Sequence, residues 1–282
     1  MILKKSKMMM SIIFIIVFLL VGWIYYTNTH IETTEYSIVN YKIPDDFHHF
    51  KIAEIADLHN QEWDDQLVNQ LEKAKPDMIA ITGDFVDSSH TNFDISIQFI
   101  KDVKHIAPIY YVTGNHEAWM GNYHEFKELL LEEDVIVLDN ENIVFKKGDS
   151  EINIIGLLDP DFIERTNIKG IQDDIIEKTL TPLINKDLYN IVLSHRPEVF
   201  KSYVSAQADL VLTGHAHGGQ VRIPFVGGLV APNQGFFPRY TEGLHHKDNT
   251  DMIISRGLGN SIIPIRINNM PELVIVELKN KK

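Results

Sequence analysis

Residues 78–87 read MIAITGDFVD, a run of five uncharged residues that ends at Gly83 and Asp84. A short apolar run that is rich in isoleucine and bounded by a turn residue is typical of a buried β-strand. An acidic side chain therefore stands where this strand would end. Because ligands in α/β folds collect at the carboxyl ends of strands, the stretch predicts both a buried strand and a site beside it.

Other parts of the chain repeat this organisation. Short apolar, β-rich runs that end at polar residues occur at 50–56, 108–113, 152–158, 189–193 and 208–213. Segments with helical periodicity occur at 63–75, 93–105, 123–133 and 197–206. Further strands are expected at 220–224, 252–255 and 273–278, which suggests a second sheet that faces the first. The sequence contains no internal repeat or linker after residue 35, so we predict one α/β domain over 35–282.

Composition restricts the chemistry of such a site. The 282 residues include no cysteine, and 39 acidic against 26 basic residues give a formal charge of −13. Disulfides, iron–sulfur clusters and thiolate zinc sites are therefore excluded, and a metal would be held by His, Asp, Glu or Asn. The acidic balance argues against a nucleic-acid partner, because a phosphate backbone is bound by clustered Lys and Arg. Oligomeric state has no signal in the sequence.

The amino-terminal segment is long and apolar enough to cross a membrane. Residues 8–26 read MMMSIIFIIVFLLVGWIYY, without a charged side chain. At 1.5 Å of rise per residue this run spans about 28 Å, close to the roughly 30 Å hydrocarbon core of a bilayer. Its aromatic end is typical of an interfacial belt. We expect a transmembrane signal anchor at 8–26 and a linker at 27–34.

The flanking charges predict the orientation of this anchor. Lys4, Lys5 and Lys7 precede it in a basic tail at 1–7, whereas the next charged residue, Glu32, is acidic. The positive-inside rule places the tail in the cytoplasm and the catalytic domain on the extracytoplasmic side of the cell membrane. A cleaved secretory signal is the alternative. Residues 27–30 read TNTH and lack an A-x-A-like cleavage site, which favours a retained single-pass anchor.

Side chains suited to metal binding follow five of the expected strands. Taken singly, each has an ordinary explanation as a turn, a cap or a buried polar residue. Together they favour a metal site, because the other eight histidines of the chain lie outside the pattern. The five blocks are Asp57-Leu58-His59, Gly83-Asp84 with Asp87 behind it, Gly114-Asn115-His116-Glu117, Ser194-His195 and Gly214-His215-Ala216-His217.

In order and content these blocks resemble the calcineurin-like metallophosphoesterases, whose signature is D-x-H, G-D, G-N-H-[DE], H and G-H-x-H. The resemblance runs from about Lys51 to the end of the chain. Residues 214–220 and 255–260, with 264–266, are more particularly similar to the bacterial membrane-associated branch of YkuE-like and YaeI-like phosphodiesterases. The resemblance implies a four-layer α/β/β/α sandwich of two facing mixed sheets flanked by helices.

The same resemblance implies a binuclear metal centre bridged by Asp84. One metal would be held by Asp57, His59, Asp84 and His217, and the other by Asp84, Asn115, His195 and His215. Two divalent ions in such a nitrogen and oxygen set would be manganese, iron or zinc rather than magnesium, and the sequence does not choose among them. The implied reaction is hydrolysis of a phosphate ester by metal-activated hydroxide.

Residues beside the ligands are given further roles. By resemblance, His116 contacts a phosphoryl oxygen or protonates the leaving group, and Asp87 holds its imidazole. The sequence leaves two roles open for Glu117, namely support of the metal centre and capping of a helix. Arg222, Arg256 and Arg266 are candidates for substrate binding, although a lone arginine is more often ion-paired at the surface. The loop at 224–238 could dip toward lipid, with ordinary packing the favoured reading.

These expectations favour a membrane-tethered phosphoesterase. The bond would be a phosphodiester or pyrophosphate, with lipid-linked or envelope-derived esters as candidate substrates. A phosphomonoesterase and a non-catalytic binding module of the same fold are the alternatives. Protein phosphatase activity is disfavoured, because Ser88-Ser89 stand where that branch has Arg-Gly.

Overall fold

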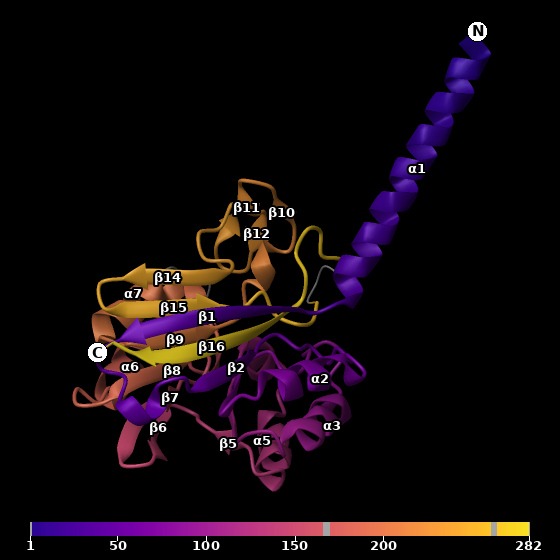
Figure 1. Cartoon of the computed structure of the whole chain (residues 1–282). Helices are drawn as coiled ribbons and strands as arrows, with labels where there is room; N and C mark the ends of the chain where they lie inside the picture. Colours follow the sequence, from indigo (N-terminus) through magenta and orange to yellow (C-terminus); the bar gives the residue numbers. More distant parts are fainter. Residues whose placement is uncertain (1, 166–169, 261–263, 282) are drawn as a thin grey trace.

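The computed structural model of the chain describes residues 2–165, 170–260 and 264–281 (Figure 1). Its first sheet has the order β1-β16-β2-β3-β4-β5. These strands are β1 (Glu32–Asn40), β16 (Glu272–Asn280), β2 (Lys51–Ile55), β3 (Met78–Thr82), β4 (Ile109–Val112) and β5 (Ile136–Val137). The three strands β2, β3 and β4 are parallel, while β16 runs antiparallel to β2 and parallel to β1.

The second sheet has the order β14-β15-β9-β8-β7-β6. Its strands are β14 (Gly243–Lys247), β15 (Thr250–Ile254), β9 (Leu210–Thr213), β8 (Tyr189–Leu193), β7 (Ser150–Gly156) and β6 (Glu141–Lys147). The central strands β7, β8, β9 and β15 are parallel, and the edge strands β6 and β14 are antiparallel to their neighbours. The sheet is therefore mixed, like the first.

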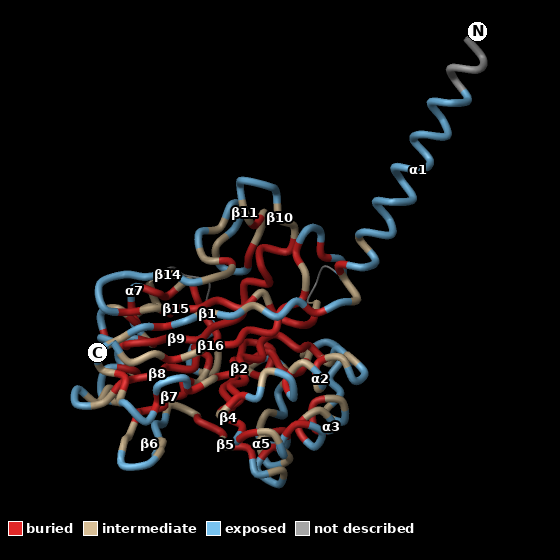
Figure 2. Tube along the Cα trace, viewed as in Figure 1, coloured by how far each residue is buried: buried red, intermediate tan, exposed pale blue. Residues whose placement is uncertain are grey.

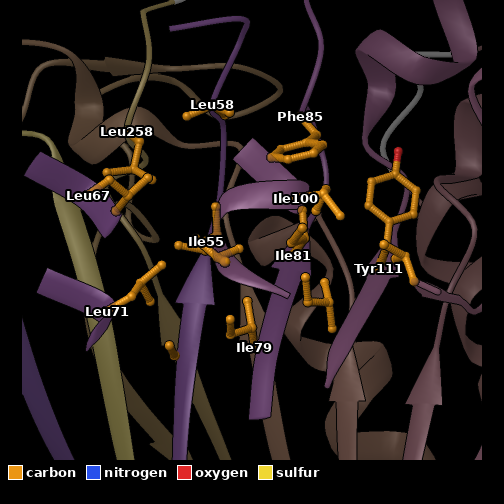
Figure 3. Close-up of a cluster of buried hydrophobic side chains, with 14 of the residues drawn as sticks. Ile55, Leu58, Leu67, Leu71, Ile79, Ile81, Phe85, Ile100, Tyr111 and Leu258 are labelled. Atoms are coloured by element: carbon orange, nitrogen blue, oxygen red, sulfur yellow. The ribbon is translucent and has the colours of Figure 1, made fainter. Parts of the chain in front are cut away.

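Helices cover the outer face of each sheet. The first sheet carries α2 (Asp65–Ala74), α3 (Phe93–Val103) and α5 (Tyr123–Glu132), and the second carries α6 (Ile171–Leu180) and α7 (Phe200–Ala206). Alternate side chains of β3 point to opposite faces of the sheet and so join different apolar layers. Ile79 and Ile81 point to Leu71 and Ile100 of the helices (Figure 3), whereas Met78 and Ala80 pack against the second sheet.

The expected α/β sandwich is confirmed, and its three apolar layers lie helix to sheet, sheet to sheet and sheet to helix. The expected arrangement of the C-terminal strands needs correction. Of these, β15 joins the second sheet, but β16 inserts between β1 and β2 of the first sheet. The expected strand at 220–224 shortens to the two residues of β10 (Arg222–Ile223).

A single helix, α1 (Ile2–Thr29), precedes the sandwich and projects away from it (Figure 1). Its stretch Lys7–Thr29 is long and apolar enough to cross a membrane, by length and composition. A cleaved signal sequence can have the same length and apolar composition. The retained anchor and its orientation therefore stay predictions. Met1 and the side chains of Lys4 and Lys5 lie outside the described part of the chain. The expected linker at 27–34 needs correction, because α1 ends at Thr29 and β1 begins at Glu32.

Candidate metal centre

The carboxyl ends of strands from both sheets supply the candidate ligands. Asp57 follows β2, Asp84 follows β3, and His195 follows β8. Asn115 begins the short helix α4 (Asn115–Trp119) after β4. His215 and His217 follow β9. The structure brings Asp57, His59, Asp84, His195, His215 and His217 into mutual range, as the order of the motifs predicts.

Backbone conformation at these loops is unusual. Asp57, His59, Asp84, His215 and His217 all have positive φ, between 46° and 66°. Residues other than glycine rarely adopt this left-handed region, and such strain concentrates at functional sites. Neighbouring segments also approach closely, since a Cβ on Gly83 would lie 2.6 Å from the Gly114 nitrogen and 2.8 Å from His195 Nδ1. Close packing of the loops thus holds several ligands in a strained arrangement.

One group of ligands consists of Asp57, His59 and His217. His59 Nε2 lies 3.2 Å from His217 Nε2, and His217 Nε2 lies 3.5 Å from Asp57 Oδ1. All three side chains are buried. Imidazole nitrogens and a carboxylate oxygen that converge in this way could hold one cation.

A second group consists of Asp84, His195 and His215. His195 Nε2 lies 3.1 Å from both Asp84 Oδ2 and His215 Nδ1. Asp84 Oδ2 also lies 3.7 Å from His59 Nε2 of the first group. One carboxylate oxygen therefore faces histidines of both groups, which is the geometry that a bridging ligand requires.

The donor atoms fit a cation. His195 Nδ1 donates to the Thr82 carbonyl at 2.8 Å, which makes Nε2, facing Asp84, the atom that would ligate a cation. The buried Asn115 Oδ1 has no hydrogen-bond partner among the described residues. An orphaned acceptor of this kind is costly unless a cation or a donor satisfies it. The set of carboxylate, amide and neutral imidazole donors suits manganese, iron or zinc.

Electrostatics agree with cation binding. Burial lowers the pKa of His215 and of His217 well below the ordinary value, so both rings are neutral and able to ligate. Burial alone would raise the pKa of Asp84, but His195 and His116 beside it hold that pKa well below its usual range. Against the opposing effect of burial, Asp84 raises the pKa of His195 to about 10, so without a metal His195 Nε2 keeps a proton that a bound cation would displace. The centre thus attracts positive charge.

His116 and Asp87 lie beside the first group. Ser88 donates its backbone N–H to His116 Nδ1 at 3.0 Å. Asp87 Oδ2 lies 3.6 Å from that nitrogen and 3.5 Å from His59 Nδ1, so it stands between two rings. Asp87 does lie near the His116 imidazole, but it is shared with His59, and its role in holding the ring stays a prediction. Since Nδ1 of His116 accepts, the neutral ring carries its proton on Nε2.

The side chain of Glu117 has both roles that the sequence left open, because it supports the metal centre and caps a helix. It is fully buried and accepts backbone N–H groups of Asp84 at 3.0 Å, Phe85 at 2.8 Å, Val86 at 3.2 Å and Gly114 at 2.6 Å. The bond from Gly114 caps α4, and the other three fix the loop that presents Asp84. Burial and the charge of Asp84 raise the pKa of Glu117 to about 7.

Sequence reasoning missed a buried arginine behind the centre. Arg196 donates to Asp159 through Nε at 2.6 Å and through Nη2 at 2.8 Å. Its Nη1 lies 3.2 Å from His215 Nε2, and Glu198 Oε1 lies 3.7 Å from the same nitrogen. The only local signal was its place directly after His195. Arg196 ties His215 to a buried ion pair.

The three arginines expected at the substrate are bound to the protein instead. Arg266 is fully buried and donates to the carbonyls of Arg256 at 2.7 Å and Gly259 at 2.5 Å. Arg256 pairs with Glu32 at 2.7 Å and with Glu272 at 3.1 Å. Arg222 pairs with Glu242 and donates to the Gly218 carbonyl at 2.9 Å. These contacts support loops around the centre, so we correct the substrate-binding assignment.

Comparison with known proteins agrees with this geometry. A sequence model of the family described as calcineurin-like phosphoesterase matches residues 50–219, more than half of the chain. The metallophosphoesterase YkuE of Bacillus subtilis is 28% identical over 267 residues, which cover 92% of this chain and 90% of that protein. The phosphodiesterase YaeI of Escherichia coli is 29% identical over 243 residues, which cover 81% of this chain and 82% of that protein. These matches confirm the resemblance seen in the motifs.

Proposed function

The chain belongs to the calcineurin-like phosphoesterase family and is a metal-dependent phosphoesterase, and from this premise we propose that it hydrolyses phosphodiester or pyrophosphate bonds with two divalent cations. One cation would be held by Asp57, His59, Asp84 and His217, and the other by Asp84, Asn115, His195 and His215. The observation that carries the proposal is the position of Asp84 Oδ2, which lies 3.1 Å from His195 Nε2 and 3.7 Å from His59 Nε2.

When bound, a pair of divalent cations lowers the pKa of water and stabilises the charge that develops on a phosphoryl group. The protein's own part is to orient the reacting groups. His116 would donate its Nε2 proton to a phosphoryl oxygen or to the leaving oxygen, because its Nδ1 is held by the Ser88 N–H. Glu117 would keep the Asp84 loop fixed, and Arg196 with Glu198 would pack against the ring of His215.

Two observations support a diester at the cell envelope. The relative YaeI is described as a phosphodiesterase and covers most of this chain. The apolar stretch of α1 would anchor the enzyme in the membrane, with the catalytic domain of residues 35–282 outside the cytoplasm. A lipid-linked or envelope-derived ester would then lie within reach.

The test uses the full chain purified in detergent. Metal analysis should find two equivalents of manganese, iron or zinc per chain. Hydrolysis of bis-p-nitrophenyl phosphate should exceed that of p-nitrophenyl phosphate and should depend on added Mn²⁺. Faster hydrolysis of the monoester would overturn the proposal that the enzyme cleaves phosphodiester or pyrophosphate bonds. A well-folded chain that binds no metal and hydrolyses neither ester would overturn catalysis and favour a binding module.

A further inference from the structure

Between the metal centre and β14, the chain leaves the sandwich and forms two small hairpins. The first pairs β10 with β11 (Gly227–Gly228), and the second pairs β12 (Val230–Ala231) with β13 (Gly235–Phe236). We call residues 222–237 the hairpin segment. Two residues separate it from η5 (His217–Gly219), which contains a candidate ligand, and it projects above the sandwich (Figure 1).

The tips of the hairpin segment present apolar side chains to solvent. Phe225 is fully exposed, and Val226, Phe236 and Phe237 are 61%, 75% and 64% exposed. Figure 2 colours the turns near β10 and β11 as exposed residues. Phe225 and Phe237 also have positive φ, at 67° and 54°, which is rare for bulky residues. Gathered apolar groups of this kind mark an interaction surface rather than ordinary packing.

The charge of this region differs from that of the rest of the chain. Residues 210–241 contain no aspartate or glutamate, although the whole chain contains 39 acidic residues. Arg222 and Arg239 are the only lysine or arginine residues in that stretch. Arg222 is paired with Glu242, so the stretch itself is close to neutral, and a surface with apolar tips and no acidic side chain suits the interfacial region of a bilayer.

Hydrogen bonds join the hairpin segment to the base of α1. Asn28 in the last turn of α1 donates its Nδ2 to the Arg266 carbonyl and accepts from the Arg266 N–H, both at 2.8 Å. The next residue, Ile267, accepts the N–H of Arg222 through its carbonyl at 3.0 Å. One strip of backbone therefore links the helix to β10, and both structures extend from the same side of the sandwich (Figure 1).

This connection places the exposed tips on the same side of the sandwich as a membrane that α1 would cross. A membrane crossed by α1 would end close to the sandwich, because β1 begins at Glu32, three residues after α1 ends at Thr29. Tyr25 and Tyr26, at the domain end of α1, suit the interfacial level of that membrane. Ile265 and Ile267, 50% and 42% exposed, add apolar surface between the helix and the hairpins.

We propose that the hairpin segment is a second membrane contact, whose apolar tips enter the outer interface of the bilayer that α1 crosses. The inference rests on the membrane anchoring included in the proposed function, but it does not depend on catalysis. It gives the metal centre a fixed position beside the lipid surface, because His217 stands at the root of the hairpin segment.

The absence of cysteine from the chain allows a direct test. Single-cysteine variants of the full chain carry one spin label each and are reconstituted in vesicles of phosphatidylcholine and phosphatidylglycerol. Phe225→Cys probes a tip, Ile15→Cys probes the middle of α1, and Tyr41→Cys is the matched exposed control. Tyr41 is 77% exposed and follows the end of β1 that lies away from α1.

The readout compares collisions of the label with oxygen, which concentrates in lipid, and with a water-soluble nickel chelate. We expect lipid-type accessibility at positions 15 and 225 and water-type accessibility at position 41. Water-type accessibility at 225 together with lipid-type accessibility at 15 would overturn the membrane contact and leave the anchor intact. Water-type accessibility at 15 would overturn anchor and contact together, while the hydrolysis assays would still report on the metal centre.

Discussion

The carboxylate of Glu117 accepts the backbone N–H of Asp84 at 3.0 Å and so fixes the loop that presents the shared ligand. Three more backbone N–H groups point at the same carboxylate. A side chain that is not itself a candidate ligand therefore helps to position the carboxylate of Asp84. Outer contacts of this kind orient metal ligands and affect metal affinity.

We expect Glu117→Gln to weaken metal binding by roughly 10–100-fold, because the amide nitrogen repels the N–H groups that the carboxylate accepts. Titration of metal-free full chain with Mn²⁺ would measure the change. Glu132→Gln, at an exposed position of α5, is the matched control and should bind like the parent. Equal affinity in the two variants would show that the loop holds its shape without Glu117.

Replacement of Asp84 tests the shared ligand. Asp84→Asn removes the charge and leaves one amide oxygen, so we expect loss of both metals and of nearly all activity. Metal analysis after purification gives the readout. The control is Asp134→Asn, since Asp134 is exposed and its positive φ is tolerated by asparagine. Retention of two metals in Asp84→Asn would contradict a bridging role.

A different pattern is expected for His116. His116→Asn should keep the full metal content but lower kcat by roughly 10²–10⁴, because proton transfer or hydrogen bonding to the phosphoryl group is lost. Steady-state kinetics and metal analysis together separate this result from that of Asp84→Asn. The exposed His124→Asn should behave like the parent. Undiminished kcat would remove His116 from the reaction.

Arg196 should matter for stability as well as for activity. Arg196→Met leaves the buried Asp159 without its partner, and breaking a buried ion pair costs about 3–5 kcal/mol. We expect a lower Tm by thermal unfolding, together with weaker metal binding because His215 loses its support. Lys201→Met, at an exposed position of α7, is the control. Equal Tm values for the two variants would contradict a structural role for the pair.

Metal loading should depend on pH through Asp57. Burial raises the pKa of the Asp57 carboxyl to about 6, although the charge of His195 opposes the rise. Protons compete with cations for a carboxylate, so the affinity should fall as the pH drops below about 6 and recover above it. Metal analysis after dialysis at graded pH tests this expectation. Unchanged loading at about pH 5 would show that the metals keep Asp57 ionised.

The fold was predictable where strands are buried on both faces. The runs that became β3 and β8 are mostly apolar and buried at every position, and the candidate ligands follow their ends. The edge strand β1 was missed, because its sequence ETTEYSIVN is polar and most of its residues are exposed or half-buried. No apolar run marks a strand that has a partner on one side and solvent on the other.

The candidate ligands were predictable because five motifs place them directly after strands. The roles of the arginines were not, because their partners lie far away in the sequence. Arg256 pairs with Glu32, and Arg222 pairs with Glu242. Nothing near an arginine in the sequence reveals that a distant carboxylate already occupies it. A similar limit applies to Asp87, whose place between two rings depends on the packing of separate loops.

The position of β16 has a consequence for biosynthesis. In the described chain β1 pairs along its whole length with β16, which also separates it from β2. The ribosome makes β1 before every other strand and β16 after all of them. The segment next to α1 must therefore wait for its partner while the other strands of the described chain emerge, and the pairing of β1 is complete only when β16 has been synthesised.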